Sequence, residues 1–255
     1  MVLCVDAGNT NIVLGGYEGQ TLVFLSRIAT QPALEADQYA LQLEGVLALH
    51  GAAKPQGAIL SSVVPPVTGA LRGALQLLCG AQPLVLSRAL CPRLPILIDN
   101  PDELGADLLA GAIAAKALYP LPAIVIDMGT ATKITAVDEQ GTVQGVSIMP
   151  GVFISLDALV NGTSLLKGIA TNAPVRAIGK NTVESMQSGV VFGAASMLDG
   201  MVERFEAELG PAKTLVATGG AAGIVVPHCR HSVQYVPTLI LDGLYAVYCR
   251  THAAL

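Results

Sequence analysis

Aromatic and charged residues are scarce in this sequence. Of its 255 residues none is Trp, 4% are aromatic and 13% are charged, whereas 52% are hydrophobic. We therefore expect an aliphatic core, and an intrinsically disordered chain is excluded, because disorder goes with low hydrophobicity and high net charge. The 14 Lys and Arg residues are scattered singly and the net charge is -5. The sequence thus predicts no nucleic-acid partner.

Long hydrophobic runs are also lacking. Pro or Gly interrupts the uncharged stretches 55–71 and 140–156, so neither reaches the roughly 18 consecutive apolar residues of a membrane-spanning helix. We expect buried strands with turns there, and no membrane partner. The first residues carry no charged segment before their short apolar run, so we expect no signal peptide.

Paired cysteines are missing. The five cysteines are odd in number and form no C-x-x-C pair, which predicts reduced thiols and a cytoplasmic location. The segment 228–231 (His-Cys-Arg-His) has no two further ligands at matching spacing, so we expect a surface loop there rather than a metal site.

Three common catalytic motifs are absent as well. The sequence has no G-x-x-x-x-G-K-[ST], no G-x-G-x-x-G after a strand and no G-x-S-x-G. These absences argue against a P-loop enzyme, a dinucleotide-binding fold and an α/β-hydrolase.

Short apolar runs alternate with helical patterns, which indicates an α/β protein. The expected strands are 2–5, 12–15, 21–28, 57–61, 83–86, 123–126, 134–137, 142–148, 214–217 and 233–236, and the expected helices are 35–50, 65–79, 101–118, 181–209 and 238–250. The opening strand pattern begins again at residue 123, after a boundary near 115–122. We therefore expect two duplicated domains, over residues 1–117 and 118–255.

The first expected strand ends on a carboxylate. Asp6 is followed by Gly8 and by the short polar residues Asn9, Thr10 and Asn11. A buried acid needs a partner for its charge, and glycine allows backbone N–H groups to approach a ligand. This group suits a metal-bound phosphate. An ordinary hairpin turn, in which side chains bond to their own backbone, explains the same residues equally well.

The second half repeats this arrangement. Asp127 follows a buried run and precedes Gly129, Thr130 and Thr132. A purely structural turn has little reason to recur with the same acid. We therefore expect two hairpins that clamp one polyphosphate from both sides, which supplies the positioning that phosphoryl transfer requires.

A third acid, Asp107, opens an apolar helical run after Gly105 and Ala106. A carboxylate on an apolar helix near a domain boundary is a candidate general base. The alternative is an acid that simply favours the positive end of its helix.

Asn181 and Thr182 precede a long helical stretch. Either residue suits the N-cap of that helix. A functional role would instead make Thr182 a hydroxyl donor to a substrate, and the sequence does not separate the two interpretations.

Five motifs occur in one order along the chain: Asp6-Ala7-Gly8-Asn9-Thr10-Asn11, Gly105-Ala106-Asp107, Asp127-Met128-Gly129-Thr130-Ala131-Thr132, Ile148-Met149-Pro150-Gly151 and Gly179-Lys180-Asn181-Thr182. Together they resemble the type III pantothenate kinases, a family of the acetate and sugar kinase, Hsp70 and actin superfamily. The resemblance implies two RNase H-like domains with an ATP cleft between them, and a homodimer. It also implies ATP-dependent phosphorylation of the primary hydroxyl of pantothenate to 4'-phosphopantothenate, the first step of coenzyme A synthesis.

The resemblance assigns roles by position. Asp107 is the expected proton acceptor, Asp127 the expected ligand of a monovalent cation (K⁺ or NH₄⁺), and Asp6 the expected partner of Mg²⁺ bound with ATP. The expected ATP-binding residues are Asp6, Ala7, Gly8, Asn9, Thr10, Asn11, Ile12, Val13, Gly129, Thr130 and Thr132. The expected substrate-binding residues are Gly105, Ala106, Asp107, Leu108 and Thr182.

Leu108 departs from the family pattern, which commonly has arginine after Gly-Ala-Asp. An arginine would supply a fixed cation for the pantothenate carboxylate or for phosphate. Two alternatives therefore stay open. The chain is a nucleotide-binding regulator without kinase activity, or it is a related kinase with a different hydroxyl substrate.

Overall fold

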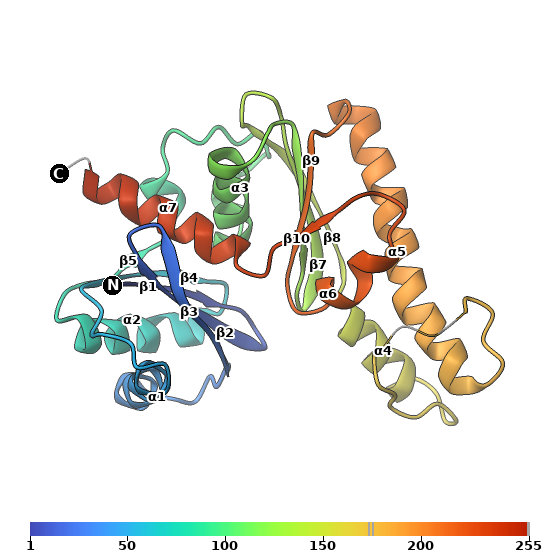
Figure 1. The fold of residues 1–255 in the computed structure, drawn as a ribbon, viewed down its shortest axis with the longest axis horizontal. Coiled ribbons are helices and arrows are strands. Elements are labelled where there is room, and N and C mark those ends of the chain that lie inside the picture. The colour runs from blue at the N-terminus through green and yellow to red at the C-terminus, as the bar shows by residue number, and fades with distance from the viewer. Residues whose placement is uncertain (173, 175, 254–255) are drawn as a thin grey trace. The chain divides into compact units, whose positions relative to one another are not determined.

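The computed structural model describes residues 1–172, 174 and 176–253, and the chain divides into two compact units (Figure 1). The first unit contains residues 1–95, 99–118 and those from 238 onward, and the second contains residues 96–98 and 119–237. Each unit is built around one five-stranded sheet. Among the described helices, none has both the length and the apolar character needed to cross a bilayer.

The two sheets share one topology. In each, three antiparallel strands are followed by two strands that run parallel to the first strand. The strand orders are β3–β2–β1–β4–β5 and β8–β7–β6–β9–β10. The strands are β1 (Val2–Ala7), β2 (Asn11–Glu18), β3 (Thr21–Ala29), β4 (Gly57–Ser62), β5 (Leu84–Val85), β6 (Ala123–Met128), β7 (Ala131–Val137), β8 (Val143–Pro150), β9 (Thr214–Thr218) and β10 (Gln234–Tyr235). The predicted duplicated α/β fold is confirmed.

Helices enclose the first sheet and cover the core side of the second. In the first unit α1 and α2 bury the face of β1 that carries Leu3 and Val5 (Figure 1), while α3 and α7 pack on the other face. In the second unit α5 and α6 bury Ile124 and Ile126 of β6. The helices are α1 (Ala36–Leu49), α2 (Pro65–Cys79), α3 (Ala106–Leu118), α4 (Val152–Asn161), α5 (Thr182–Leu209), α6 (Ala222–Val225) and α7 (Leu239–Ala253).

Helix α7 belongs to the first compact unit, although it comes last in the chain. A Cβ atom at Gly243 would strike the backbone carbonyl of Ala110 in α3, so glycine permits the two helices to touch. The Tyr17 hydroxyl donates a 2.6 Å hydrogen bond to the Asp242 carboxylate. Burial, and then this hydrogen bond, raise the pKa of Tyr17 well above its usual value. The division expected from the sequence places α7 with residues 118–237 instead.

The helix expected over 101–118 is interrupted. Residues Pro101–Glu103 form one 3₁₀ turn, and α3 begins only at Ala106. The Asn100 side chain accepts the Asp102 N–H at 3.3 Å and caps the N-terminal end of this turn. Leu104, which follows the turn, has an extended backbone. The interruption places Asp107 in the first turn of a helix instead of its middle.

Helix α4 is not anticipated from the sequence, which predicts strands and turns as far as residue 156. Apolar residues are not confined to its buried face, because Phe153 and Ile154 are exposed while Val152 and Leu156 are buried. Such a segment gives no helical periodicity. The strand expected over 83–86 is also shorter, since only Leu84–Val85 pairs with β4.

Asp199 of α5 holds the segment 228–231 in place. Only 6% of this residue is exposed. Its carboxylate accepts hydrogen bonds from the backbone N–H groups of Arg230 and His231. His231 Nδ1 also lies 2.9 Å from Asp199 Oδ1. Burial acts to raise the pKa of Asp199, but these hydrogen bonds outweigh it and lower the pKa. No group of three or more potential metal ligands occurs among the described residues, this segment included.

Asp199→Asn should destabilise the second unit. Hydrogen bonds to a charged acceptor contribute about 1.5–3 kcal/mol and neutral ones about 0.5–1.5 kcal/mol, so we expect the free energy of unfolding in urea to fall by about 1–2 kcal/mol at neutral pH. Because the folded-state pKa is lowered, this contribution is present above the unfolded pKa of about 3.9 and is lost as the pH falls through the folded value. Asp157→Asn, at an exposed position on α4, is the control. Equal losses of unfolding free energy in both variants would contradict a stabilising role for the hydrogen bonds between Asp199 and the segment 228–231.

Candidate active site

The turn between β1 and β2 is tied down from both sides. Gly8 N–H donates to the Asn11 carbonyl at 3.0 Å, and the Thr30 hydroxyl of the segment after β3 donates to the Gly8 carbonyl at 2.6 Å. A Cβ atom at Gly8 would lie 3.3 Å from the Asn11 carbonyl. The Gly8 N–H therefore closes the turn.

The polar groups left at the tip belong to Asn9 and Thr10, which are both exposed. Ala7 and Ile12 are opposite partners in the strand pair and are fully buried in the core. Asp6 lies on the other face of β1, where it is half-buried. Only some residues of the segment expected to bind ATP therefore present side chains that could contact a phosphate or a metal ion.

Asp107 lies in the same unit, at the same edge of the sheet. A Cβ atom built on Gly105 would be 2.7 Å from Asp107 Oδ1 and 3.7 Å from Cγ1 of Val63. Val63 follows β4 directly, and its N–H donates to the Ala7 carbonyl at 3.1 Å. Asp107 is therefore close to the end of β1 that carries Asp6.

The Asp107 side chain is buried. It is 8% exposed, and its Oδ1 accepts the N–H of the following Leu108 at 2.7 Å. Leu108 is itself buried, so its side chain shields the helix end from water.

The turn between β6 and β7 in the second unit matches the first. Gly129 N–H donates to the Ala131 carbonyl at 3.1 Å, as Gly8 does to Asn11. The turn rests on Gly151, where a Cβ atom would lie 2.6 Å from the Gly129 carbonyl and even closer to that of Thr130. On the other side Gly219, with a φ of +93°, lies against the Met128 backbone.

Strand register separates the two faces of this hairpin. Asp127 is opposite Lys133, and Met128 is opposite Thr132. Because opposite partners share a face, the Thr132 side chain lies on the core side with Met128. Thr132 is fully buried, and its hydroxyl has no hydrogen-bond partner within the described part of the chain.

Lys133 is the residue that the sequence interpretation missed. Its Nζ lies 2.8 Å from Asp127 Oδ2, and both side chains are 15% exposed. The signal was available, because the connection of three residues, 129–131, between the paired positions Met128 and Thr132 places Lys133 opposite Asp127. Lys133 thus adds a positive charge at the second hairpin.

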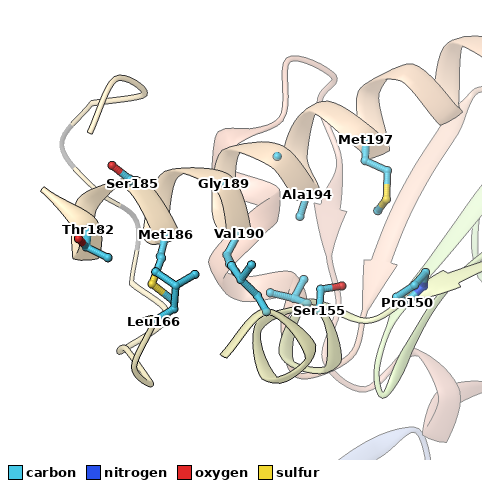
Figure 2. A pocket seen from close by; sticks show the side chains of 13 residues that line it. Pro150, Ser155, Leu166, Thr182, Ser185, Met186, Gly189, Val190, Ala194 and Met197 are labelled. Atoms are coloured by element: carbon cyan, nitrogen blue, oxygen red, sulfur yellow. The ribbon is translucent and has the colours of Figure 1, made fainter. Parts of the chain in front are cut away.

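Thr182 lines a cavity of about 740 Å³ between α4 and α5. Figure 2 shows Thr182 and Met186 at one end of it, and Pro150 at the other. The Asn181 side chain accepts the Glu184 N–H at 2.9 Å and is the helix cap, which leaves Thr182 outside that role. Pro150 pairs with Ala131, so the far end of the cavity lies beside the second hairpin. The full lining is Pro150, Val152, Ser155, Leu159, Leu166, Thr182, Ser185, Met186, Gly189, Val190, Gly193, Ala194 and Met197.

Magnesium brought in by a nucleotide needs only one or two protein carboxylates in addition to phosphate oxygens. Asp6 meets that requirement, since it is half-buried at a strand end beside an exposed polar turn. The residues present therefore fit a nucleotide-bound magnesium ion.

Gly151→Ala tests whether the second turn matters for ligand binding. The added Cβ cannot coexist with the carbonyls of residues 129 and 130, so the turn must move, and a displacement of this kind is expected to weaken ATP affinity by about tenfold or more. Gly145→Ala on β8, where a Cβ would meet nothing within 4 Å, is the control. Isothermal titration with magnesium and ATP measures both, and wild-type affinity in Gly151→Ala would exclude the turn from the site.

Solved structures similar to this chain share the actin-like ATPase fold. A Baf-family protein from Campylobacter jejuni superposes with a TM-score of 0.64 at 18% identity, covering 98% of this chain and 99% of the other. The activator of 2-hydroxyisocaproyl-CoA dehydratase from Clostridium difficile, which holds ADPNP, has a TM-score of 0.60 at 12% identity, with 99% and 96% covered. At such identities the similarity establishes the fold alone.

Sequence comparison is more specific. The family model for type III pantothenate kinase matches residues 2–204. A type III pantothenate kinase from Moorella thermoacetica is 40% identical over 252 residues, which are 98% of this chain and 99% of that protein. With both hairpins and Asp107 in the order that this family has, the chain belongs to the type III pantothenate kinase family.

Proposed function

We propose that this protein transfers the γ-phosphoryl group of ATP to the primary hydroxyl of pantothenate, giving 4'-phosphopantothenate for coenzyme A synthesis. The observation that carries the proposal is that both sheets of this family member have the same arrangement at the end of their first strand. Each sheet ends its first strand on an acid followed by a glycine-closed turn, and a buried third acid lies at the edge of the first sheet.

The two turns are the proposed phosphate-binding elements. Asn9 and Thr10 present polar groups at the first tip and Thr130 at the second, and Asp6 is the proposed partner of the metal. When bound with ATP, Mg²⁺ supplies charge neutralisation at the β- and γ-phosphates. The rigid turns supply the positioning, on which phosphoryl transfer depends more than on covalent chemistry.

Asp107 is the proposed proton acceptor. The hydroxyl oxygen of pantothenate forms a bond to the γ-phosphorus while the bond from that phosphorus to the β–γ bridging oxygen breaks. The hydroxyl proton passes to the Asp107 carboxylate, and ADP leaves. Burial beside Leu108 keeps the carboxylate away from bulk water, which favours its contact with the substrate hydroxyl.

The substrate is proposed to contact two places. Gly105, Ala106 and Leu108 surround Asp107 in sequence, and Thr182 lines the cavity of the second unit. The lining is mainly apolar and suits the gem-dimethyl and methylene groups of pantothenate, while Thr182 offers a hydroxyl to its amide or carboxylate. Leu108 contributes no cation, so the substrate carboxylate must be bound without a guanidinium at that position.

A homodimer and a cytoplasmic location are also part of the proposal. Seven exposed large hydrophobic side chains lie between residues 148 and 183 of the second unit, and a contact with a second copy would cover such side chains. They are Ile148, Phe153, Ile154, Leu159, Leu165, Ile178 and Val183. Free cysteines throughout the described chain agree with a reducing compartment.

The proposed monovalent cation at Asp127 meets a difficulty in the structure. The Lys133 ammonium lies 2.8 Å from that carboxylate, so a positive group already occupies the place that the family resemblance gives to K⁺ or NH₄⁺.

Purified protein should release ADP from ATP only when pantothenate is present. A coupled ADP assay with and without pantothenate tests this, and a panel of other small alcohols serves as the specificity control. Binding of ATP without turnover on any alcohol would replace the proposal with the regulator alternative. Turnover on a different alcohol would identify a related kinase.

Asp107→Asn should abolish turnover while ATP affinity stays near wild type, because the amide cannot accept the proton. General bases contribute about 10²–10⁴-fold, and we expect a loss of kcat in that range. Asp102→Asn, an exposed acid in the preceding 3₁₀ turn, is the matched control. A near-wild-type rate in Asp107→Asn would remove this residue from the base role.

A further inference from the structure

The second hairpin carries its own cation. We infer that the Lys133 ammonium replaces a monovalent metal ion at Asp127, so that phosphoryl transfer by this chain does not require K⁺. The inference rests on the proposed function, because it concerns the same site. It concerns Lys133 as a positioning residue, which acts on the phosphate-binding turn through Asp127.

The pair is fixed by the sheet. Asp127 and Lys133 are opposite partners on adjacent strands, and Asp127 also pairs with Thr218 of β9 on its other side. Strand β6 is therefore held between two neighbours, and the carboxylate cannot move far from the ammonium. With 15% of each side chain exposed, both groups are largely shielded from water and salt, so their attraction is screened much less than that of an exposed pair.

Charge explains why a cation is needed at this point. A carboxylate beside the 129–130 turn repels the phosphate oxygens that the turn is proposed to hold. An ammonium at 2.8 Å compensates that charge, and it does so permanently because it is tethered to the strand. A dissolved ion would instead have to be captured from solution and would compete with Lys133 for the same oxygen atoms.

The geometry also limits what an added ion could do. Lysine carries three donors and no acceptor, so the ammonium group offers no ligand atom to K⁺ and repels it. The Thr132 hydroxyl, an oxygen in the same hairpin, is buried on the opposite face with Met128. The Asp127 carboxylate therefore suits a fixed ammonium better than a captured metal ion, since the Thr132 hydroxyl is not on its face.

The test compares cations at equal ionic strength, in KCl, NaCl, NH₄Cl and choline chloride. Wild-type kcat should agree within about twofold in all four salts, because screening is the same. Lys133→Thr, which keeps a good strand residue, should lose about tenfold or more of its activity in choline chloride, since a compensating charge at the phosphates is missing. KCl or NH₄Cl should restore much of that activity. Lys133→Arg should remain active and independent of the salt.

A second measurement does not use turnover. With ADPNP bound, exchanging choline for K⁺ should raise the melting temperature of Lys133→Thr and leave that of the wild type unchanged. Lys213→Thr, which removes an exposed lysine paired only loosely with Glu139 at 3.8 Å, is the control and should behave as the wild type in both measurements.

The outcomes separate the two proposals. Absence of turnover in every salt would reject the proposed function, and the melting temperatures would then still decide the role of Lys133. A wild type that depends on K⁺ as strongly as Lys133→Thr, or a Lys133→Thr that does not respond to K⁺, would overturn the inference. If Lys133→Thr fails to fold, the salt dependence of the wild type and of Lys133→Arg decides it.

Discussion

A half-buried carboxylate at the end of a central strand is the constraint on which each half of this molecule depends. Asp6 and Asp127 both stand where a buried strand meets a turn, and a charge in that position requires a partner. The turn that follows must be tight enough to bring polar groups near the acid. This requirement accounts for Gly8 and Gly129, for the threonine that ties the first turn, and for Gly151 beneath the second.

The two acids have different neighbours in the two units. In the first unit, the edge near Asp6 also receives the start of α3 and therefore Asp107. In the second unit, the edge near Asp127 has the Lys133 ammonium and one end of an apolar cavity. The duplicated fold thus has the buried carboxylate proposed as the proton acceptor in one copy, and an ammonium group and an apolar cavity in the other.

The sequence could predict the duplicated sheets because strand and turn signals are local. Runs such as 2–5 and 123–126 are apolar and are followed by an acid and then by a glycine, and the structure has strands there. It could not predict α4, whose exposed positions include the large apolar residues Phe153 and Ile154, nor the break before Ala106, where Leu104 has an extended backbone. Lys133 was missed because its importance comes from the residue across the hairpin. The hydrogen bond that closes the first turn was not anticipated either, because the acceptor of the Gly8 N–H is three residues away.

The position of α7 has a consequence for how the protein is made. Residues 238–253 complete the first unit by packing on α3, yet they are synthesised after the whole of the second unit. The second unit is nearly continuous in sequence and can acquire its sheet while the chain is still on the ribosome, whereas the first must wait for α7 before Tyr17 finds Asp242. The unit whose strands are synthesised first is therefore the unit that is completed last.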